Sequence, residues 1–199
     1  ENYTVNGVMK TSVNLQVGTY GYELAKNANV PNSTEDYTIS FWMKTNNMNM
    51  ANASVMHLCN FETGDKLSIA MNSTAFSNNC IQTISKVDGA TTNKSSTVVA
   101  SSGTWMNIIL TVDSGTGTLY INGNKSITDI SVGDIFTSSN YAMYTGVTDD
   151  AMVQYFYTAL DEVYLYNGAL SESEIAILAN SGNYNNGDFV TARITISSN

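Results

Sequence analysis

The sequence predicts an all-β fold, an antiparallel sandwich of two sheets with one short helix near the C-terminus. Three observations support this prediction. Short segments rich in β-branched and aromatic residues alternate between apolar and polar positions through most of the chain. Turn sequences of Gly, Asn and Asp separate these segments. A single segment with helix-capping residues follows the last long strand.

The alternation is clearest in the segment 37–44, which reads YTISFWMK. Alternate side chains of a strand lie on opposite faces of a sheet. We therefore expect one face of this strand in the core, with the side chains of Tyr37, Ile39, Phe41 and Met43. Trp42 falls on the other face.

Two hairpins are predicted further along the chain, each made of two strands joined by a short turn that contains Gly. The strands are Val55–Phe61 with Lys66–Met71, and Trp105–Val112 with Thr118–Ile121. Asn122-Gly123 follows the second hairpin and forms a two-residue turn, in which both positions must tolerate a positive φ. Trp105 begins its strand, and we expect its ring in the core.

The segment Ala159–Leu178 changes from a strand to a helix. Ser171 and Glu174 have the spacing of a capping box, in which each side chain hydrogen-bonds the other residue's backbone N–H. Leu170 and Ile175 have the spacing of a hydrophobic staple. We expect a helix from Glu172 to about Asn180.

The composition predicts one domain over residues 1–199, because a chain of this length with 43% apolar residues can bury a core. The net charge of -9 argues against nucleic acid and anionic membranes as partners. No apolar run is long enough to span a membrane. Neither an initiator Met nor a signal peptide is present, so we expect a removed leader or an excised module. The many Asn, Ser, Thr, Gly and Tyr residues favour an extracellular location.

Cys59 and Cys80 are the two cysteines of the chain. The expected strand order places the strands around them on either side of Lys66–Met71. Strands two positions apart stand beyond the usual reach of a disulfide. We expect two free, partly buried thiols.

Four ordered blocks of the sequence are distinctive together. They read TISFWMKT at 38–45, GTWMNIILTVDSGTGTLYINGN at 103–124, YTG at 144–146 and LDEVYLYNGALSESEI at 160–175. In these blocks the chain resembles the laminin-G-like, concanavalin A-like jelly-roll family. The resemblance implies a jelly-roll sandwich with about six strands in each sheet, one sheet concave, and ligand-binding loops along its rim. It does not specify an activity, because this fold hosts lectins, carbohydrate-binding modules, adhesion domains, glycosidases and structural proteins.

The N-terminal region departs from the family pattern. Members usually begin with an additional strand and an acidic or Asn-rich loop, upstream of the block that here reads Thr4-Val5-Asn6-Gly7. Near the C-terminus, Phe189–Ile196 alternates as one more strand. We expect this segment to occupy the sheet position that the upstream strand would otherwise take.

Asp161 lies where the resemblance implies a structural calcium ligand. Calcium requires about six to eight oxygens, so one carboxylate is never sufficient. The alternative is a strand-edge carboxylate that is hydrogen-bonded to turn amides. The pair Asp149 and Asp150 in a late loop is a second candidate for metal binding, against the alternative of solvated loop carboxylates.

Aromatic residues are the candidates for contact with a sugar. Trp42 can stack on a sugar ring if its face is open, or it can be covered by a loop or helix. Four tyrosines surround the long late loop, and any of them can present a ring at its rim. They are Tyr141, Tyr144, Tyr155 and Tyr157.

The sequence argues against an enzyme. Glycosidases that resemble this family carry paired carboxylates as Glu-x-Asp-x-x-Glu on one strand, because both acids must face the same cleft. That pattern is absent from the chain. The single histidine, His57, lies in an apolar strand without an evident Ser or Asp constellation.

Two non-catalytic functions remain. The first is a carbohydrate-binding or adhesion module of a secreted or surface protein, whose partner is a glycan or a glycoprotein surface. The second is a structural or assembly protein of a virus particle or cell-surface layer, which self-associates or binds other surface subunits. Methionines such as Met48 and Met50 would supply adaptable apolar contacts in the second case.

Overall fold

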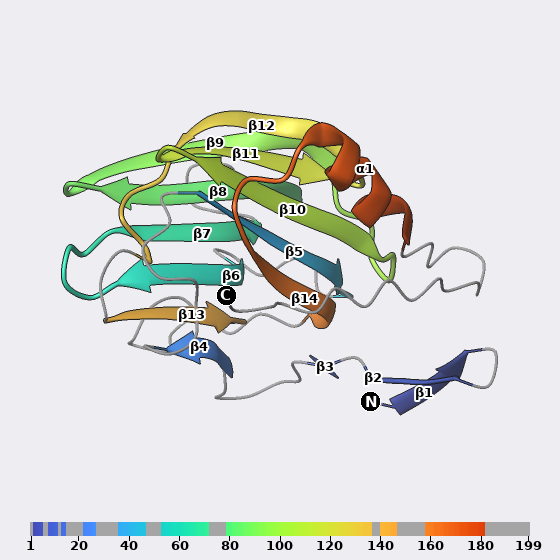
Figure 1. Cartoon of the computed structure of the whole chain (residues 1–199). Helices are drawn as coiled ribbons and strands as arrows, with labels where there is room; N and C mark the ends of the chain where they lie inside the picture. Colours follow the sequence, from blue (N-terminus) through green and yellow to red (C-terminus); the bar gives the residue numbers. More distant parts are fainter. Residues whose placement is uncertain are drawn as a thin grey trace.

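The computed structural model describes residues 2–5, 8–11, 13–14, 22–26, 36–46, 53–71, 79–136, 140–146 and 158–181. Within these ranges it confirms the predicted antiparallel sandwich with one short helix (Figure 1). Two six-stranded sheets form the sandwich, and a separate hairpin pairs β1 (Asn2–Val5) with β2 (Val8–Thr11).

The sheet that carries the helix is called sheet I here, and its strands run in the order β12-β11-β10-β5-β14-β3. In that order they span Asn124–Ser131, Thr116–Ile121, Met106–Asp113, Tyr37–Lys44, Ala159–Asn167 and Val13–Asn14. The other sheet is called sheet II, and its order is β4-β13-β6-β7-β8-β9. Its strands span Tyr22–Lys26, Tyr141–Thr145, Ala53–Asn60, Lys66–Met71, Cys80–Val87 and Ala90–Val99.

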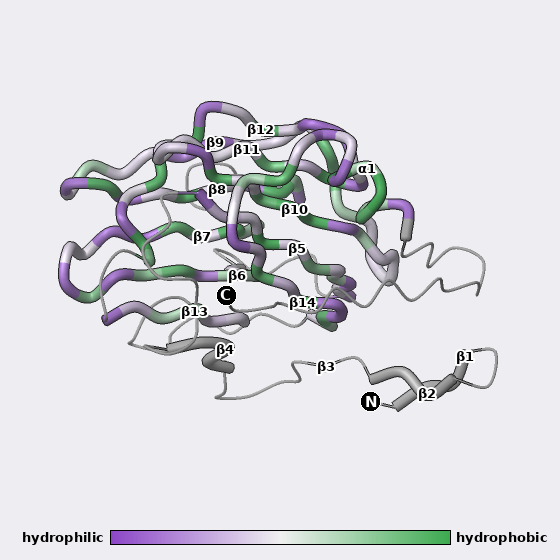
Figure 2. The backbone as a smooth tube through the Cα atoms, in the orientation of Figure 1, coloured by the Kyte–Doolittle hydropathy of each residue, from purple (hydrophilic) through white to green (hydrophobic). Residues whose placement is uncertain are grey.

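The core lies between the two sheets. Apolar stretches follow the strands, whereas hydrophilic residues gather at the turns (Figure 2). All four alternate residues predicted from β5 are buried in the core, namely Tyr37, Ile39, Phe41 and Met43. At one edge of the sandwich, Lys94 Nζ of β9 donates a hydrogen bond to Thr128 O of β12 at 2.8 Å.

The cysteine prediction is also confirmed. Strand β7 lies between β6 and β8, so it separates the strands that carry Cys59 and Cys80. The two cysteines form no disulfide with each other, and both are buried.

Trp105 is a correction to the sequence prediction. Its ring is half-buried and does not belong to the core cluster, because the next residue, Met106, faces the core opposite Met43. The ammonium of Lys44 lies 5.0 Å from the centre of the Trp105 ring, a cation–π contact.

Strand β14 contains a β-bulge. Asp161 pairs with Trp42 and Tyr164 pairs with Ser40, so two residues of β14 lie opposite Phe41. Glu162 adopts a φ of 49°, in the left-handed region that a β-bulge often uses. The extra residue lets both Leu160 and Val163 pack on the core, although they are three positions apart.

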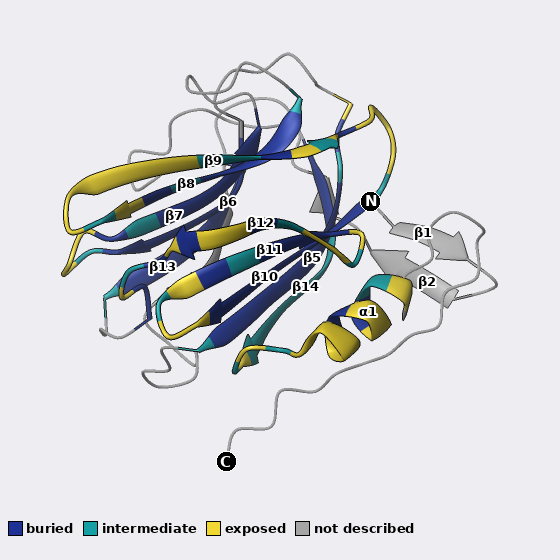
Figure 3. Ribbon diagram, turned by 90° about the horizontal axis from the view of Figure 1, so that it is seen from above, coloured by how far each residue is buried: buried dark blue, intermediate teal, exposed yellow. Residues whose placement is uncertain are grey.

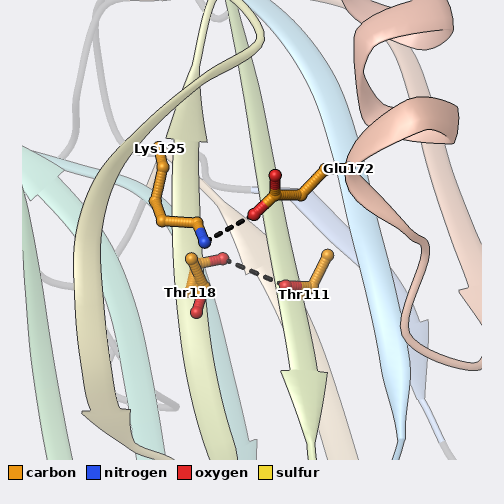
Figure 4. Close-up of polar contacts among 4 residues, drawn as sticks. All are labelled: Thr111, Thr118, Lys125 and Glu172. Atoms are coloured by element: carbon orange, nitrogen blue, oxygen red, sulfur yellow. Dashed lines mark hydrogen bonds and ion pairs between the residues drawn. The ribbon is translucent and has the colours of Figure 1, made fainter.

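Helix α1 (Glu172–Ser181) covers the outer face of sheet I (Figures 1 and 3). Ile175 and Leu178 pack on Ile109 and Tyr120 of that sheet, and Leu170 joins the same cluster, as expected for a staple. Lys125 Nζ and Glu172 Oε1 form an ion pair at 2.6 Å between β12 and the start of the helix (Figure 4). This exposed pair contributes little to stability.

The predicted capping box begins the helix. Ser171 N donates to Glu174 Oε2 at 2.8 Å, and Glu174 N donates to Ser171 Oγ at 3.4 Å. The hydrogen bonds from the Ser171 side chain and backbone lower the pKa of Glu174 below its ordinary value.

This lowered pKa predicts a pH-dependent contribution of Glu174 to stability. A carboxyl whose pKa is lower in the folded state stabilises the fold above the unfolded pKa and loses that effect as pH falls through the folded pKa. We expect Glu174→Gln to destabilise the protein more at pH 7 than at pH 3, as measured by urea unfolding at both. In a Ser171→Ala background the difference between the two pH values should shrink. An equal effect of Glu174→Gln at both pH values would contradict the prediction.

Candidate functional site

The outer faces of the two sheets differ in what they carry. Helix α1 closes the outer face of sheet I with an apolar cluster. On the outer face of sheet II, the strand pairings align mainly polar side chains in three rows across β13, β6, β7, β8 and β9. These side chains are buried on β6 and, apart from Lys66, on β7, and they are exposed on much of β9 (Figure 3).

The middle row passes through the pair of His57 and Ser68. It runs from Tyr144 through His57, Ser68 and Ile84 to Asn93. His57 Nδ1 and Ser68 Oγ are 2.6 Å apart, and both residues are buried. Such a short contact fixes the orientation of the imidazole and of the hydroxyl.

The second row consists of Ser54, Ala70, Gln82 and Ser95. Val55 is the extra residue of a β-bulge, so the adjacent residues Val55 and Met56 both face the core. Ser54, before the bulge, lies on the outer face opposite Ala70. The bulged backbone is held by β13, because Thr145 Oγ1 donates to Val55 O at 2.7 Å. Ser54 is 0% exposed, and its hydroxyl makes no hydrogen bond.

The third row lies nearest to the β6–β7 turn. It consists of Ala142, Cys59, Lys66, Lys86 and Thr91. At its β13 end, Cys59 and Ala142 form a small apolar cluster with Tyr144, and Phe61 packs against it. The outer face of sheet II thus combines hydroxyl, amide, imidazole, aromatic and ammonium groups.

Asp65 ties together three segments at the end of sheet II. Its carboxylate accepts hydrogen bonds from Asp88 N, in the β8–β9 turn, and from Asp134 N, after β12, each at 3.1 Å. In the β6–β7 turn, which also contains Asp65, Asn60 Oδ1 accepts a hydrogen bond from Glu62 N at 2.9 Å. These bonds position the turns that border the three rows.

The structure brings together two residues that the sequence singled out. Asp161 of β14 pairs with Trp42 of β5, and Asn107 of β10 pairs with Trp42 from the other side. This row lies on the outer face of sheet I. Trp42 is only 8% exposed, so its ring is covered, in agreement with the second of the two alternatives for this residue.

Asp161 accepts a hydrogen bond from a backbone amide, as expected if it is a strand-edge carboxylate and not a calcium ligand. Its Oδ1 accepts from Glu162 N at 2.8 Å, within the β-bulge. In the described part of the chain, no group of three or more His, Cys, Asp or Glu side chains lies close enough to hold a metal. Asp149 and Asp150 lie outside the described residues. Calcium binding at any of these carboxylates stays a prediction.

The four tyrosines fall into three places. Tyr141 lies in the core, where its ring contacts Phe136 edge to face at 5.1 Å. The expected rim position of this ring is therefore wrong, because Tyr141 and Met143 lie on the core face of β13. Tyr144 lies on the outer face of sheet II, where it is buried beside Cys59. Tyr155 and Tyr157 lie outside the described residues, as does the C-terminal segment Phe189–Ile196.

Sequence reasoning did not identify Ser54, Ser68 and Gln82 as candidate residues. The signal was present for β7, where Ser68 and Ala70 alternate with Leu67, Ile69 and Met71. Alternation identifies the outer face of one strand, but only the register shows which outer residues of different strands meet.

Comparison with known proteins supports the fold. Residues 17–176 match the family model described as the concanavalin A-like lectin/glucanases superfamily. No curated protein matches the sequence significantly. Within the described part of the chain, no helix is long and apolar enough to cross a membrane.

Several solved structures are similar to this chain. Domain 4 of an extracellular arabinanase from Geobacillus stearothermophilus, in complex with arabinotriose, has a TM-score of 0.64 and 22% identity, over 80% of this chain and 72% of that one. The CBM40 domain of a Ruminococcus gnavus sialidase, bound to α2,3-sialyllactose, has a TM-score of 0.63 and 16% identity, over 85% and 98%. A heptameric pentraxin from Limulus polyphemus has a TM-score of 0.56 and 13% identity, over 74% and 71%.

At these identities the structural similarity concerns the fold, because one such fold hosts many functions. The family model covers most of the chain, and the two antiparallel sheets have the jelly-roll architecture that it implies. The chain therefore belongs to the concanavalin A-like lectin/glucanase superfamily.

Proposed function

We propose that this protein is a non-catalytic carbohydrate-binding module of a secreted or surface protein, and that the outer face of sheet II binds the glycan. One observation carries the proposal: the rows on this sheet face combine hydroxyl, amide, imidazole and ammonium groups, and they reach the surface at Lys86, Thr91 and Asn93. Saccharides are recognised by such groups, because their hydroxyls both donate and accept hydrogen bonds.

The sequence supports the non-catalytic part of the proposal. The Glu-x-Asp-x-x-Glu pattern of paired carboxylates is absent from it. Glycoside hydrolysis ordinarily requires two carboxyl groups that flank the scissile bond. The complexes of the similar arabinanase domain and CBM40 domain with oligosaccharides are in keeping with the same class of ligand.

The test is a glycan array followed by affinity electrophoresis on the glycans that are retained. We expect Asn93→Ala to weaken binding about tenfold, because Asn93 is exposed at the β9 end of the middle row and loss of one hydrogen bond to a ligand costs on the order of 1 kcal/mol or more. Thr118→Ala, on the outer face of sheet I, is the control and should bind as the original protein does. Retention of no glycan across a diverse array would count against the proposal.

Calcium is proposed as a structural ion at Asp161, which would need further oxygens from the chain. An ion that binds only the folded protein raises its unfolding temperature. We expect calcium, but not magnesium, to raise the unfolding temperature relative to chelator, and Asp161→Ala to remove the difference. Equal unfolding temperatures in calcium and in chelator would exclude a structural role for the ion.

A further inference from the structure

The last long strand of sheet I, β14, has one side that the described strands cover only in part. On its other side β5 pairs with it from Ala159 to Asn167. On the partly covered side β3 pairs with Ala159 and Leu160 alone, and within the described ranges no strand pairs there with Val163 or Leu165. Both Val163 and Leu165 pack on the core but are only half-buried. A strand edge of this kind is open to pairing with a further strand.

A hairpin that belongs to neither sheet precedes this edge in the chain. Among the described strands β1 and β2 pair only with each other, and two residues join them between Val5 and Val8. A two-stranded hairpin by itself is marginally stable in water. β2 ends at Thr11 and β3 begins at Val13, so one residue separates the hairpin from a strand that already pairs with β14 (Figure 1). The hairpin is therefore tethered next to the open side of β14.

The register of β3 specifies where β2 would meet β14. Val13 pairs with Leu160 in an antiparallel orientation, so residues that precede Val13 would pair with residues that follow Leu160. The β-bulge adds one residue to β14 in this region. Continued past the bulge, the register gives three pairs, namely Lys10 with Tyr164, Met9 with Leu165 and Val8 with Tyr166.

These pairs match the faces of both strands. Directly opposite residues of neighbouring strands share a face, and Leu165 faces the core. Alternation then assigns Met9 and Thr11 to the core face of the added strand and Lys10 to its outer face. Without the bulge in β14, Lys10 would lie opposite the core-facing Val163. The bulge therefore brings the apolar and polar positions of β2 into agreement with those of β14.

We propose that β2 is a strap that closes on β14 and extends β3 along sheet I, with β1 as the new outer strand. In the closed arrangement β2 covers Val163 and Leu165 from the side. The edge of β14 is then no longer available to a strand of another chain, which is the usual risk of an open edge. Closure of the strap does not depend on the binding of a ligand.

Disulfide formation between the two strands tests the closure. Lys10→Cys together with Tyr164→Cys puts two thiols at directly opposite positions, within the reach of a disulfide. We expect this link to form within one chain, at least about tenfold faster than in the control variant Lys10→Cys with Tyr166→Cys, whose positions are offset by two residues. Peptide mass spectrometry identifies the linked residues, so Cys59 and Cys80 stay in place.

A second measurement needs no introduced cysteine. Met9→Gln places an amide on the core face of the strap, whereas Lys10→Gln is a matched change on its outer face. We expect Met9→Gln to lower the unfolding temperature by about 3 °C or more, and Lys10→Gln to change it by less than about 1 °C. Sedimentation velocity should show more association for Met9→Gln, because its strap covers the edge of β14 less completely.

The possible outcomes separate the strap from its alternatives. A fast link between positions 10 and 164 within one chain, together with a larger effect of Met9→Gln, supports the closed strap. A link that joins two chains would overturn it in favour of an exchange of hairpins between two copies. Faster linkage of the offset pair would overturn the register. Equal linkage in both pairs, or equal effects of the two glutamine variants, would show that the hairpin does not close on β14.

Discussion

Replacement of Asp65 by Ala is expected to lower the free energy of unfolding by about 2–5 kcal/mol. The carboxylate is 5% exposed and accepts the N–H groups of Asp88 and Asp134. Without it, two backbone N–H groups in separate segments each lose a hydrogen bond to a charged acceptor. Guanidinium unfolding followed by fluorescence measures the change.

Glu62→Ala is the control for this prediction, because Glu62 is an exposed carboxylate in the same hairpin turn. It should change stability by no more than about 0.5 kcal/mol. If Asp65→Ala is as mild as this control, the carboxylate does not hold the three segments together.

Gly133 lies against the Asp65 carboxylate in the fold and allows a second test of this prediction. A Cβ atom at position 133 would overlap the Asp65 carboxylate, so Gly133→Ala should also destabilise the protein. Alanine at position 65 lacks the carboxylate, and the double variant should therefore lose less stability than the sum of the two single variants. Strict additivity would show that the two positions do not compete for the same space.

Replacement of Ile175 by Ala is expected to destabilise the protein by about 2–5 kcal/mol, the usual range for truncation of a buried isoleucine. Ile175 is 0% exposed and packs between α1 and sheet I. The helix is only ten residues long, and helices of this length depend on packing for their stability. Hydrogen exchange should show faster exchange of the α1 amides, together with the lower stability on urea unfolding.

The same helix supplies the matched control. Ile177 is 66% exposed, and Ile177→Ala makes the same chemical change on the opposite side of α1. We expect its effect to stay within about 0.5 kcal/mol. Similar losses for the two variants would mean that helix propensity, and not the contact with sheet I, sets the stability of this region.

Much of the fold was predictable because local physics specifies it. The alternation in β5 identified its core face, and the capping box and staple identified the start of α1. The separation of the two cysteines followed from the hairpin order. These features depend on residues within a few positions of each other, or on hairpins between neighbouring strands.

The candidate site was less predictable, because it depends on how strands align. The bulges at Val55 and Glu162 each interrupt the two-residue alternation, and they decide where Ser54 and Asp161 lie. Leu160 and Val163 are three residues apart, and in a regular strand they would lie on opposite faces. The bulge between them places both on the core side. Tyr141 and Tyr144 were both candidates in the sequence. They are three positions apart on β13 and therefore lie on opposite faces, and only the packing of the two sheets shows that Tyr141 is the one in the core.

The sequence by itself determined the fold class, the family resemblance, the core face of β5, the helix cap and the lack of a paired-carboxylate motif. Only the tertiary structure showed that Ser54, Ser68 and Gln82 surround Ala70, that Trp42 is covered, and that Asp65 joins three segments. The physical reason is that alternation and capping are local properties of the chain. The meeting of side chains from different strands depends on register, which is set by bulges and by packing of the whole sandwich.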